Sequence, residues 1–177
     1  MRATIIAMLI LLLPAALLAS PTMLINYSGG HTYYTPTAPF TVFDAYVIGS
    51  DIECYLDASE FMVSYPPNVV QTGFDIPAGS LNLGDPSSGV SITYWPPMDG
   101  WNPGWNLLCT LHMITLAPCA QMYNSPVSIV ADPATGFIQG VCWPDNTIFN
   151  FAGTTSIICP SEIAVQSKSW GSIKSLF

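Results

Sequence analysis

The chain has 177 residues, and only 8% of them are Asp, Glu, Lys or Arg, against about 25% in an ordinary soluble domain. Acidic residues outnumber basic ones 11 to 3, and no Lys or Arg occurs between residues 20 and 167. Proteins neutralise the phosphates of nucleic acids and lipid headgroups with Lys and Arg, and phosphoryl-transfer sites use the same side chains as clamps. The composition therefore speaks against nucleic-acid binding, basic adhesion to anionic membranes and phosphoryl transfer.

Residues 1–19 have the pattern of a secretory signal peptide. Arg2 supplies the positive start, residues 5–13 are apolar, and a small-residue cleavage region ends at Ala19. The alternative is a membrane anchor, but the apolar run is shorter than the ~20 residues that a spanning helix needs, and Pro14 interrupts it. We expect cleavage after Ala19, a secreted or surface-displayed protein, and no transmembrane helix in the mature chain.

Short strands dominate the predicted elements that follow. Gly and Pro punctuate runs rich in Val, Ile, Thr, Tyr and Phe at intervals of roughly eight to twelve residues, a rhythm typical of an all-β sandwich or barrel. Within such runs apolar and polar residues alternate, which indicates one buried and one solvated face. In chain order, the predicted strands are 41–48, 60–65, 69–74, 90–95, 107–116, 126–131, 137–143 and 154–159.

These runs predict a single antiparallel β-sandwich of about eight to nine strands, occupying residues 20–160 and followed by a short tail, 161–177. Residues 107–114 are apolar at nearly every position, which favours a central strand covered on both faces. Residues 132–136, with Gly136 available for a positive φ, predict the turn of a hairpin.

The mature chain carries five cysteines, an odd number in a compartment that forms disulfides. They are Cys54, Cys109, Cys119, Cys142 and Cys159. We expect two bridges and one remaining thiol, with a connectivity that spacing alone does not settle. The first candidate pair is Cys119 with Cys142, because the predicted hairpin between them brings their ends together, and the second is Cys54 with Cys109. No zinc-binding spacing occurs.

A resemblance to known sandwiches lies in residues 60–82. The extended strand there ends in a tyrosine, prolines and an asparagine before the next strand begins, with the residues Phe61, Val63, Tyr65, Pro66, Pro67, Asn68, Val69 and Val70. This arrangement resembles cohesin-like and carbohydrate-binding-module-like β-sandwiches, and residues 107–116 sit where those folds place a central strand. The resemblance implies an Ig-like or cohesin-like sandwich and carries no catalytic residue.

The tail ends in the nine residues SWGSIKSLF, 169–177. They resemble a short terminal signature of exported bacterial proteins, which implies a bacterial exported protein. Apolar residues fall three and four positions apart, on one face of a short helix, and the tail carries the mature chain's cations. The candidate recognition residues are Trp170, Gly171, Ile173, Lys174, Leu176 and Phe177. We expect a tag read by export or anchoring machinery; the alternative is an amphipathic helix lying on the chain's own acidic domain.

Three tryptophans within eleven residues mark the best candidate ligand site. Trp95, Trp101 and Trp105 lie in a Pro- and Gly-rich segment, and their indole faces suit the apolar faces of sugar rings. Asp99 and Asn102 would bind sugar hydroxyls, so the segment predicts a glycan site. The alternative is that the indoles fold over an open end of the sandwich and extend its core.

Other clusters point less clearly to chemistry. The carboxylates of Asp51, Glu53, Asp57 and Glu60 have oxygen ligands of the kind that calcium prefers, but their spacing is not that of an EF-hand, and the alternative is a solvated acidic connection. We therefore expect no metal and no cofactor.

Enzyme motifs are missing from the sequence. His112 falls inside a predicted strand, which favours a satisfied core histidine, His31 lies in a Gly-rich stretch, and neither accompanies a nucleophile motif. Asp99 and Asp145 form a carboxylate pair only if loops bring them together. We therefore expect a non-enzymatic binding module, with a glycan or a surface protein as partner. The alternative is a structural protein of an extracellular assembly or envelope, because low charge opposes edge-to-edge pairing only weakly.

Overall fold

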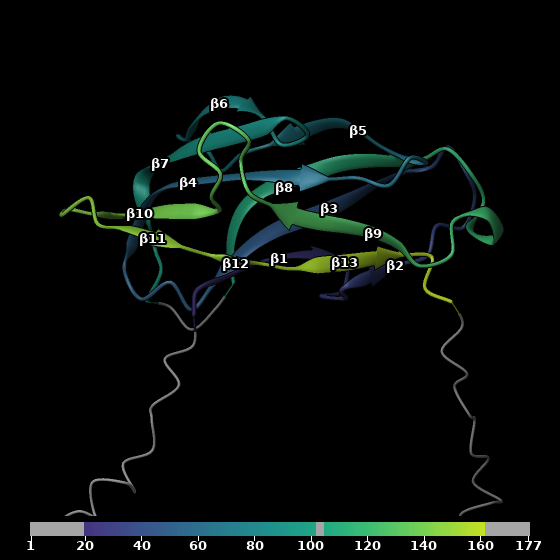
Figure 1. Cartoon of the computed structure of the whole chain (residues 1–177), viewed down its shortest axis with the longest axis horizontal. Helices are drawn as coiled ribbons and strands as arrows, with labels where there is room; N and C mark the ends of the chain where they lie inside the picture. The colour runs from purple at the N-terminus through teal and green to yellow at the C-terminus, as the bar shows by residue number, and fades with distance from the viewer. Residues whose placement is uncertain (1–19, 102–104, 162–177) are drawn as a thin grey trace, which may run out of the picture.

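The computed structural model describes residues 20–101 and 105–161, which form two β-sheets packed face to face (Figure 1). The predicted signal peptide, residues 1–19, and residues 162–177 of the predicted tail lie outside the described residues. The strands are β1 (Thr22–Tyr27), β2 (Tyr33–Tyr34), β3 (Val42–Ser50), β4 (Tyr55–Ser64), β5 (Val69–Asp75), β6 (Leu81–Asp85), β7 (Gly89–Asp99), β8 (Asn106–Thr115), β9 (Ser125–Val130), β10 (Gln139–Trp143), β11 (Ile148–Asn150), β12 (Ala152–Gly153) and β13 (Thr155–Ile158). A short 3₁₀ helix, η1 (Cys119–Gln121), precedes β9.

One sheet has five strands in the order β12-β1-β3-β8-β5. The other has eight and is built around the long strand β4, which pairs with β7 on one edge and with β10 and β9 on the other. β6 extends the sheet beyond β7, β11 beyond β10, and β13 and β2 beyond β9. The pairings β1 with β12 and β13 with β2 are parallel and the others are antiparallel. The predicted antiparallel sandwich is confirmed.

The core lies between the two sheets and follows the alternation seen in the sequence. In β3, Phe43, Ala45 and Val47 are buried, and in β7, Val90 and Ile92 are completely enclosed. Side chains of a strand point alternately to its two faces, so each strand sends every second residue into the core. The same alternation occurs in β1, a strand that the sequence interpretation omitted.

β8 is an inner strand, between β3 and β5, but it is not covered on both faces. Leu108, Leu111 and Met113 are buried, whereas Leu107 is 40% exposed and His112 lies on the outer face. The prediction of double coverage was wrong because this sheet is an outer layer of a two-layer sandwich. The prediction of a core histidine at position 112 fails for the same reason.

The turn at residues 132–136 forms as predicted, but the strands on either side of it do not pair. The Gly136 amide donates to the Asp132 carbonyl at 2.7 Å, and Gly136 has a φ of 78°. β9 pairs with residues 62–64 of β4 and β10 with residues 55–60, so the two strands lie end to end along one edge of β4 (Figure 1). The predicted hairpin is therefore a loop between two collinear segments.

This arrangement corrects the predicted disulfides. Cys119 precedes β9 and Cys142 lies in β10, so the two cysteines are separated by the length of both strands along β4. That length is about eleven residues at roughly 3.3 Å each, too far for a disulfide. The structure pairs Cys54 with Cys142 and Cys119 with Cys159, with Cα–Cα distances of 5.8 Å and 5.2 Å. Cys109, predicted to bridge to Cys54, is a buried free thiol on β8. Each disulfide ties one end of the sandwich.

Candidate binding face and aromatic cleft

The tryptophan segment forms part of a strand and leaves its indoles exposed. β7 continues through Pro96 and Pro97 as far as Asp99, and Trp95, Trp101 and Trp105 are 70%, 62% and 59% exposed. The alternative that the three indoles extend the core is therefore wrong.

The three indoles do not form one site. Trp95 and Trp101 line two neighbouring cavities. Trp105 lies over Gly30, where an added Cβ would be 3.6 Å from the indole ring. Asp99 accepts a hydrogen bond from the Trp101 backbone amide at 3.1 Å, and Asn102 lies outside the described residues.

Two aromatic residues that the sequence interpretation missed complete these cavities. Tyr55 begins β4 and Trp143 ends β10, and the two residues are directly paired across the strands. Their rings meet edge to face, with centroids 6.3 Å apart. A Trp-Pro dipeptide at 143–144 repeats the one at 95–96, and this was the available signal.

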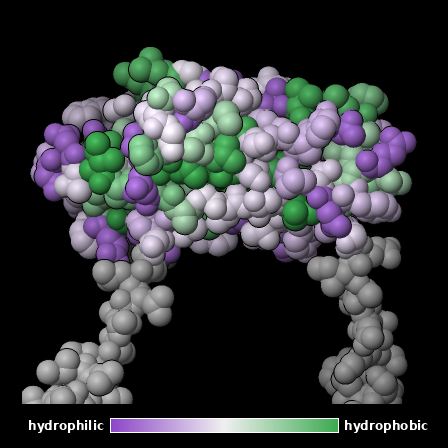
Figure 2. Space-filling view, viewed as in Figure 1, coloured by the Kyte–Doolittle hydropathy of each residue, from purple (hydrophilic) through white to green (hydrophobic). Residues whose placement is uncertain are grey.

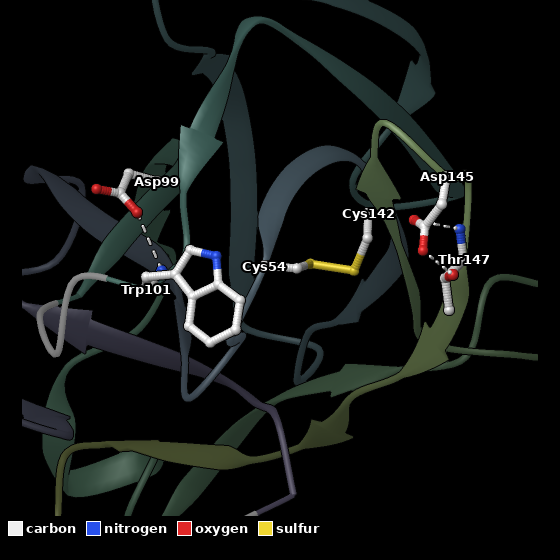
Figure 3. Close-up of a disulfide and its surroundings, with 6 residues drawn as sticks. All are labelled: Cys54, Asp99, Trp101, Cys142, Asp145 and Thr147. Atoms are coloured by element: carbon white, nitrogen blue, oxygen red, sulfur yellow. Dashed lines mark hydrogen bonds between the residues drawn. A yellow bond between two sulfur atoms is a disulfide. The ribbon is translucent and has the colours of Figure 1, made fainter.

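The larger cavity, of about 420 Å³, is named the aromatic cleft here. It lies beside the Cys54–Cys142 disulfide and is lined by Glu53, Cys54, Tyr55, Trp101, Cys142, Trp143, Pro144, Asp145 and Thr147. Figure 3 shows the disulfide between the Trp101 ring on one side and the Asp145–Thr147 turn on the other. A second cavity, of about 260 Å³, adjoins it and is lined by Tyr55, Trp95, Pro96, Pro97 and Trp143.

Backbone contacts hold the walls of the aromatic cleft in place. The Gly100 amide donates to the Cys54 carbonyl at 2.9 Å, and the Glu53 amide donates to the Gly100 carbonyl at 3.2 Å. A Cβ at Gly100 would lie 2.2 Å from the Cys54 carbonyl oxygen, so only glycine permits this approach. The Asp145 carboxylate accepts hydrogen bonds from the Thr147 hydroxyl at 2.8 Å and the Thr147 amide at 3.2 Å. These bonds hold the pKa of Asp145 below its usual value.

A second candidate surface is the outer face of β6, β7, β4, β10 and β11, named the sheet face here. One row of directly opposed residues crosses all five strands: Leu81, Thr93, Ala58, Val141 and Ile148. Directly opposed residues share a face, so this row is continuous and carries no charge. Leu81 and Ile148, at its two ends, are 75% and 64% exposed.

The adjacent row of the sheet face contains Leu83, Ser91, Glu60, Gln139 and Asn150. Leu83 is 79% exposed, and Gln139 donates a hydrogen bond to the single carboxylate of the row, Glu60. Figure 2 shows strongly hydrophobic side chains projecting over β6 at the top of the molecule. The sheet face therefore carries one largely apolar row beside a mostly polar row, with exposed leucine and isoleucine side chains at its edges.

The outer face of the five-stranded sheet is different. There His112 Nδ1 lies 2.7 Å from Asp44 Oδ1, and His112 Nε2 lies 3.0 Å from Asp75 Oδ2. One imidazole thus bridges carboxylates from the two neighbouring strands, β3 and β5. Hydrogen bonds to Asp44 and then to Asp75 raise the pKa of His112.

The described residues do not assemble the other constellations considered from the sequence. Asp57 and Glu60 lie within β4, and no three His, Cys, Asp or Glu side chains gather as a metal site in 20–101 and 105–161. Asp99 and Asp145 lie on opposite sides of the disulfide, each bound to a nearby turn (Figure 3). No helix within the described ranges is long and apolar enough to cross a membrane.

Comparisons with known proteins identify the architecture. No protein-family model matches the chain, and no curated protein matches its sequence. Among solved structures, the third ScaB cohesin of R. flavefaciens superposes with a TM-score of 0.54 at 9% identity, covering 81% of this chain and 97% of that one. The sixth cohesin of scaffoldin B from Acetivibrio cellulolyticus superposes with a TM-score of 0.53 at 10% identity, covering 78% of this chain and 97% of that one. CaCohA2 from Clostridium acetobutylicum superposes with a TM-score of 0.51 at 12% identity, covering 82% of this chain and 93% of that one.

The fold is cohesin-like. The cohesin-like sandwich accounts for nearly the whole length of each of these modules, and at this level of identity the likeness concerns the fold alone. The expected cohesin-like architecture is confirmed.

Proposed function

We propose that the chain is a secreted, non-enzymatic module that binds a protein partner on the sheet face. The observation that carries this is the uncharged row from Leu81 to Ile148, which crosses five strands in register. Exposed apolar residues bordered by polar ones often mark the surface on which a protein binds a partner. The A. cellulolyticus and R. flavefaciens structures are complexes of cohesins with dockerins, which supports a protein as the partner class.

The test is capture on the immobilised chain from the secreted proteins of its source, followed by affinity measurement on each isolated partner. We expect Leu81→Asp together with Ile148→Asp to weaken binding by about ten-fold or more, because both residues would lose apolar contact and bury a charge. The matched control is Val42→Asp together with Val70→Asp, which puts the same two charges on exposed residues of the other sheet. Equal affinity in all three proteins, or equal loss in both variants, would contradict the proposal.

Secretion and tail recognition belong to the same proposal. N-terminal sequencing of the exported protein should begin at Ser20, and recovery of Met1 would contradict the signal peptide. A chain ending at Pro160 should be exported but lose the localisation of the full chain if residues 161–177 are a sorting tag. Unchanged localisation would contradict the proposal that residues 161–177 are a sorting tag. The glycan site predicted from Trp95, Asp99, Trp101, Asn102 and Trp105 stays a prediction.

A further inference from the structure

The aromatic cleft combines several ring systems within one cavity. Tyr55, Trp101 and Trp143 all line it, and each is at least 45% exposed. The faces of such rings carry partial negative charge and attract cations, with Trp the strongest of them. A volume of about 420 Å³ is large enough for a small ligand or one long side chain.

The polar side chains of the aromatic cleft are chiefly hydrogen-bond acceptors. Glu53 and Asp145 contribute carboxylates, and Thr147 already donates its hydroxyl proton to Asp145. Among the described residues, 20–101 and 105–161, the lining contains no Asn, Gln, Lys, Arg or His, so the indoles and the Tyr55 hydroxyl are its remaining side-chain donors there. Sugar hydroxyls both donate and accept, whereas ammonium and guanidinium groups only donate. The lining therefore complements a donor-only, positively charged group better than a sugar.

The surrounding charge favours the same ligand. Ten of the eleven acidic residues lie between residues 20 and 161, where the sequence has no Lys or Arg. No Lys or Arg of the described residues competes for the cleft, and the acidic charge of residues 20–161 attracts cations. The Thr147 hydrogen bonds lower the pKa of Asp145, which favours the charged form of this carboxylate.

We propose that the aromatic cleft binds the arginine or lysine side chain of a partner protein, with its cationic group held by the aromatic rings and by Glu53 and Asp145. This inference goes beyond binding at the sheet face, because the cleft uses different residues and can be tested with the partner unknown.

The experiment is a titration of the ¹⁵N-labelled full chain, read on the indole N–H signals, each assigned with a Trp→Phe variant. The probes are N-acetyl-arginine methylamide, N-acetyl-lysine methylamide and the neutral analogue N-acetyl-citrulline methylamide. We expect the arginine and lysine probes to shift Trp101 and Trp143 and the citrulline probe to leave them in place. Trp105, which lies over Gly30, serves as the internal control and should not move.

Isosteric variants separate charge in the cleft from charge elsewhere. Asp145→Asn and Glu53→Gln should each weaken arginine binding by about five-fold, the loss expected for one exposed charge contact. Asp75→Asn removes the same charge from the outer face of the other sheet. Its affinity for the arginine probe should stay within about two-fold of the wild-type value, which is on the order of measurement scatter. Raising the salt concentration should weaken binding to the wild-type chain.

Four results would overturn the proposal. Equal shifts with citrulline would show that charge is not recognised, and shifts with cellobiose but not with arginine would make the cleft a glycan site. Tetramethylammonium binding without arginine or lysine binding would make it a site for free small cations. Movement of the Trp101 and Trp143 signals on truncation after Ser161, with no probe added, would make the chain's own tail the occupant.

Discussion

At the scale of single residues, His112 shows how position in a sheet decides the role of a titratable group. Its strand is apolar enough to suggest burial, yet its side chain lies on the solvent side between Asp44 and Asp75. The bridge joins three neighbouring strands, β3, β8 and β5. Protonation strengthens both contacts, because the imidazolium is a double donor that faces two carboxylates.

The raised pKa of His112 predicts a dependence of stability on pH. The pKa of His112 in the folded state lies above the unfolded value of 6.5, so the folded state binds this proton more tightly. The resulting stabilisation is complete at pH values below 6.5, and it disappears as the pH rises through the folded-state pKa. We expect the melting temperature of the wild-type chain to fall more than that of His112→Gln as the pH rises from about 5.5 to about 8.5, roughly a unit or two on either side of the ordinary histidine pKa. His31→Gln, which removes the other histidine, should retain the wild-type slope, and parallel curves for all three proteins would contradict the prediction.

A second residue-scale prediction concerns a hydrogen bond inside the core. Tyr94 Oη lies 2.6 Å from Ser59 Oγ, and both residues are buried. Tyr94→Phe leaves the Ser59 hydroxyl without this partner and should lower the free energy of unfolding by about 1–3 kcal/mol. The double variant Tyr94→Phe with Ser59→Ala removes both polar groups and should recover most of the loss. Urea unfolding measures both effects, and a double variant as unstable as the single one would contradict the explanation.

At the scale of elements, the long strand β4 organises its sheet and explains the disulfides. β9 and β10 continue one another along the same edge of β4, so their far ends lie at opposite ends of the sandwich. The Cys54–Cys142 disulfide ties the start of β4 to β10, and Cys119–Cys159 joins the turn before β9 to the end of β13. Since Cys109 is buried, the pKa of its thiol is raised and the group stays protonated.

Removal of either bridge should destabilise the chain. We expect Cys54→Ala with Cys142→Ala, and Cys119→Ala with Cys159→Ala, each to lower the free energy of unfolding by about 2–4 kcal/mol. The first pair should have the larger effect, because its cysteines are 88 residues apart and the others 40. Cys109→Ala keeps both bridges and is the control. A non-reduced digest that links Cys119 to Cys142 would refute the assignment.

At the scale of the whole molecule, charge and apolar surface oppose one another. Ten acidic residues and no Lys or Arg between residues 20 and 161 make copies of the domain repel each other. The edge strand β6 presents Leu81 and Leu83 to solvent, and an open apolar edge favours pairing with another chain. If the charge repulsion is stronger, the chain is a monomeric binding module. If the pairing of apolar edges is stronger, it is a self-assembling structural protein.

We expect the chain to be a monomer at low ionic strength, because repulsion between acidic domains is then least screened. Light scattering coupled to size-exclusion chromatography measures the mass over a range of concentrations. A mass that rises with concentration, and that returns to the monomer in Leu83→Glu, would favour self-assembly. A constant mass in both proteins supports the binding module.

Most of the fold was predictable because it depends on local alternation. The eight strands expected from residue 41 onward all correspond to strands of the structure, within a few residues at either end. The missed strands β2 and β12 have two residues each, too few to show a period, and β6 exposes its leucines instead of burying them. The site was only partly predictable: Trp95 and Trp101 were identified, but Tyr55 and Trp143 come from distant segments that meet through the pairing of β4 with β10.

By itself, the sequence determined the all-β class, the alternation that fills the core, the exclusion of a basic surface and the turn at Gly136. These depend on composition and on neighbours in the chain. Only the tertiary structure decided which cysteines pair, on which face His112 lies and which aromatic residues surround the cleft. The reason is that β9 and β10 both pair with β4 instead of with each other, and that choice is made by long-range strand pairing, which residues 119–143 alone do not encode.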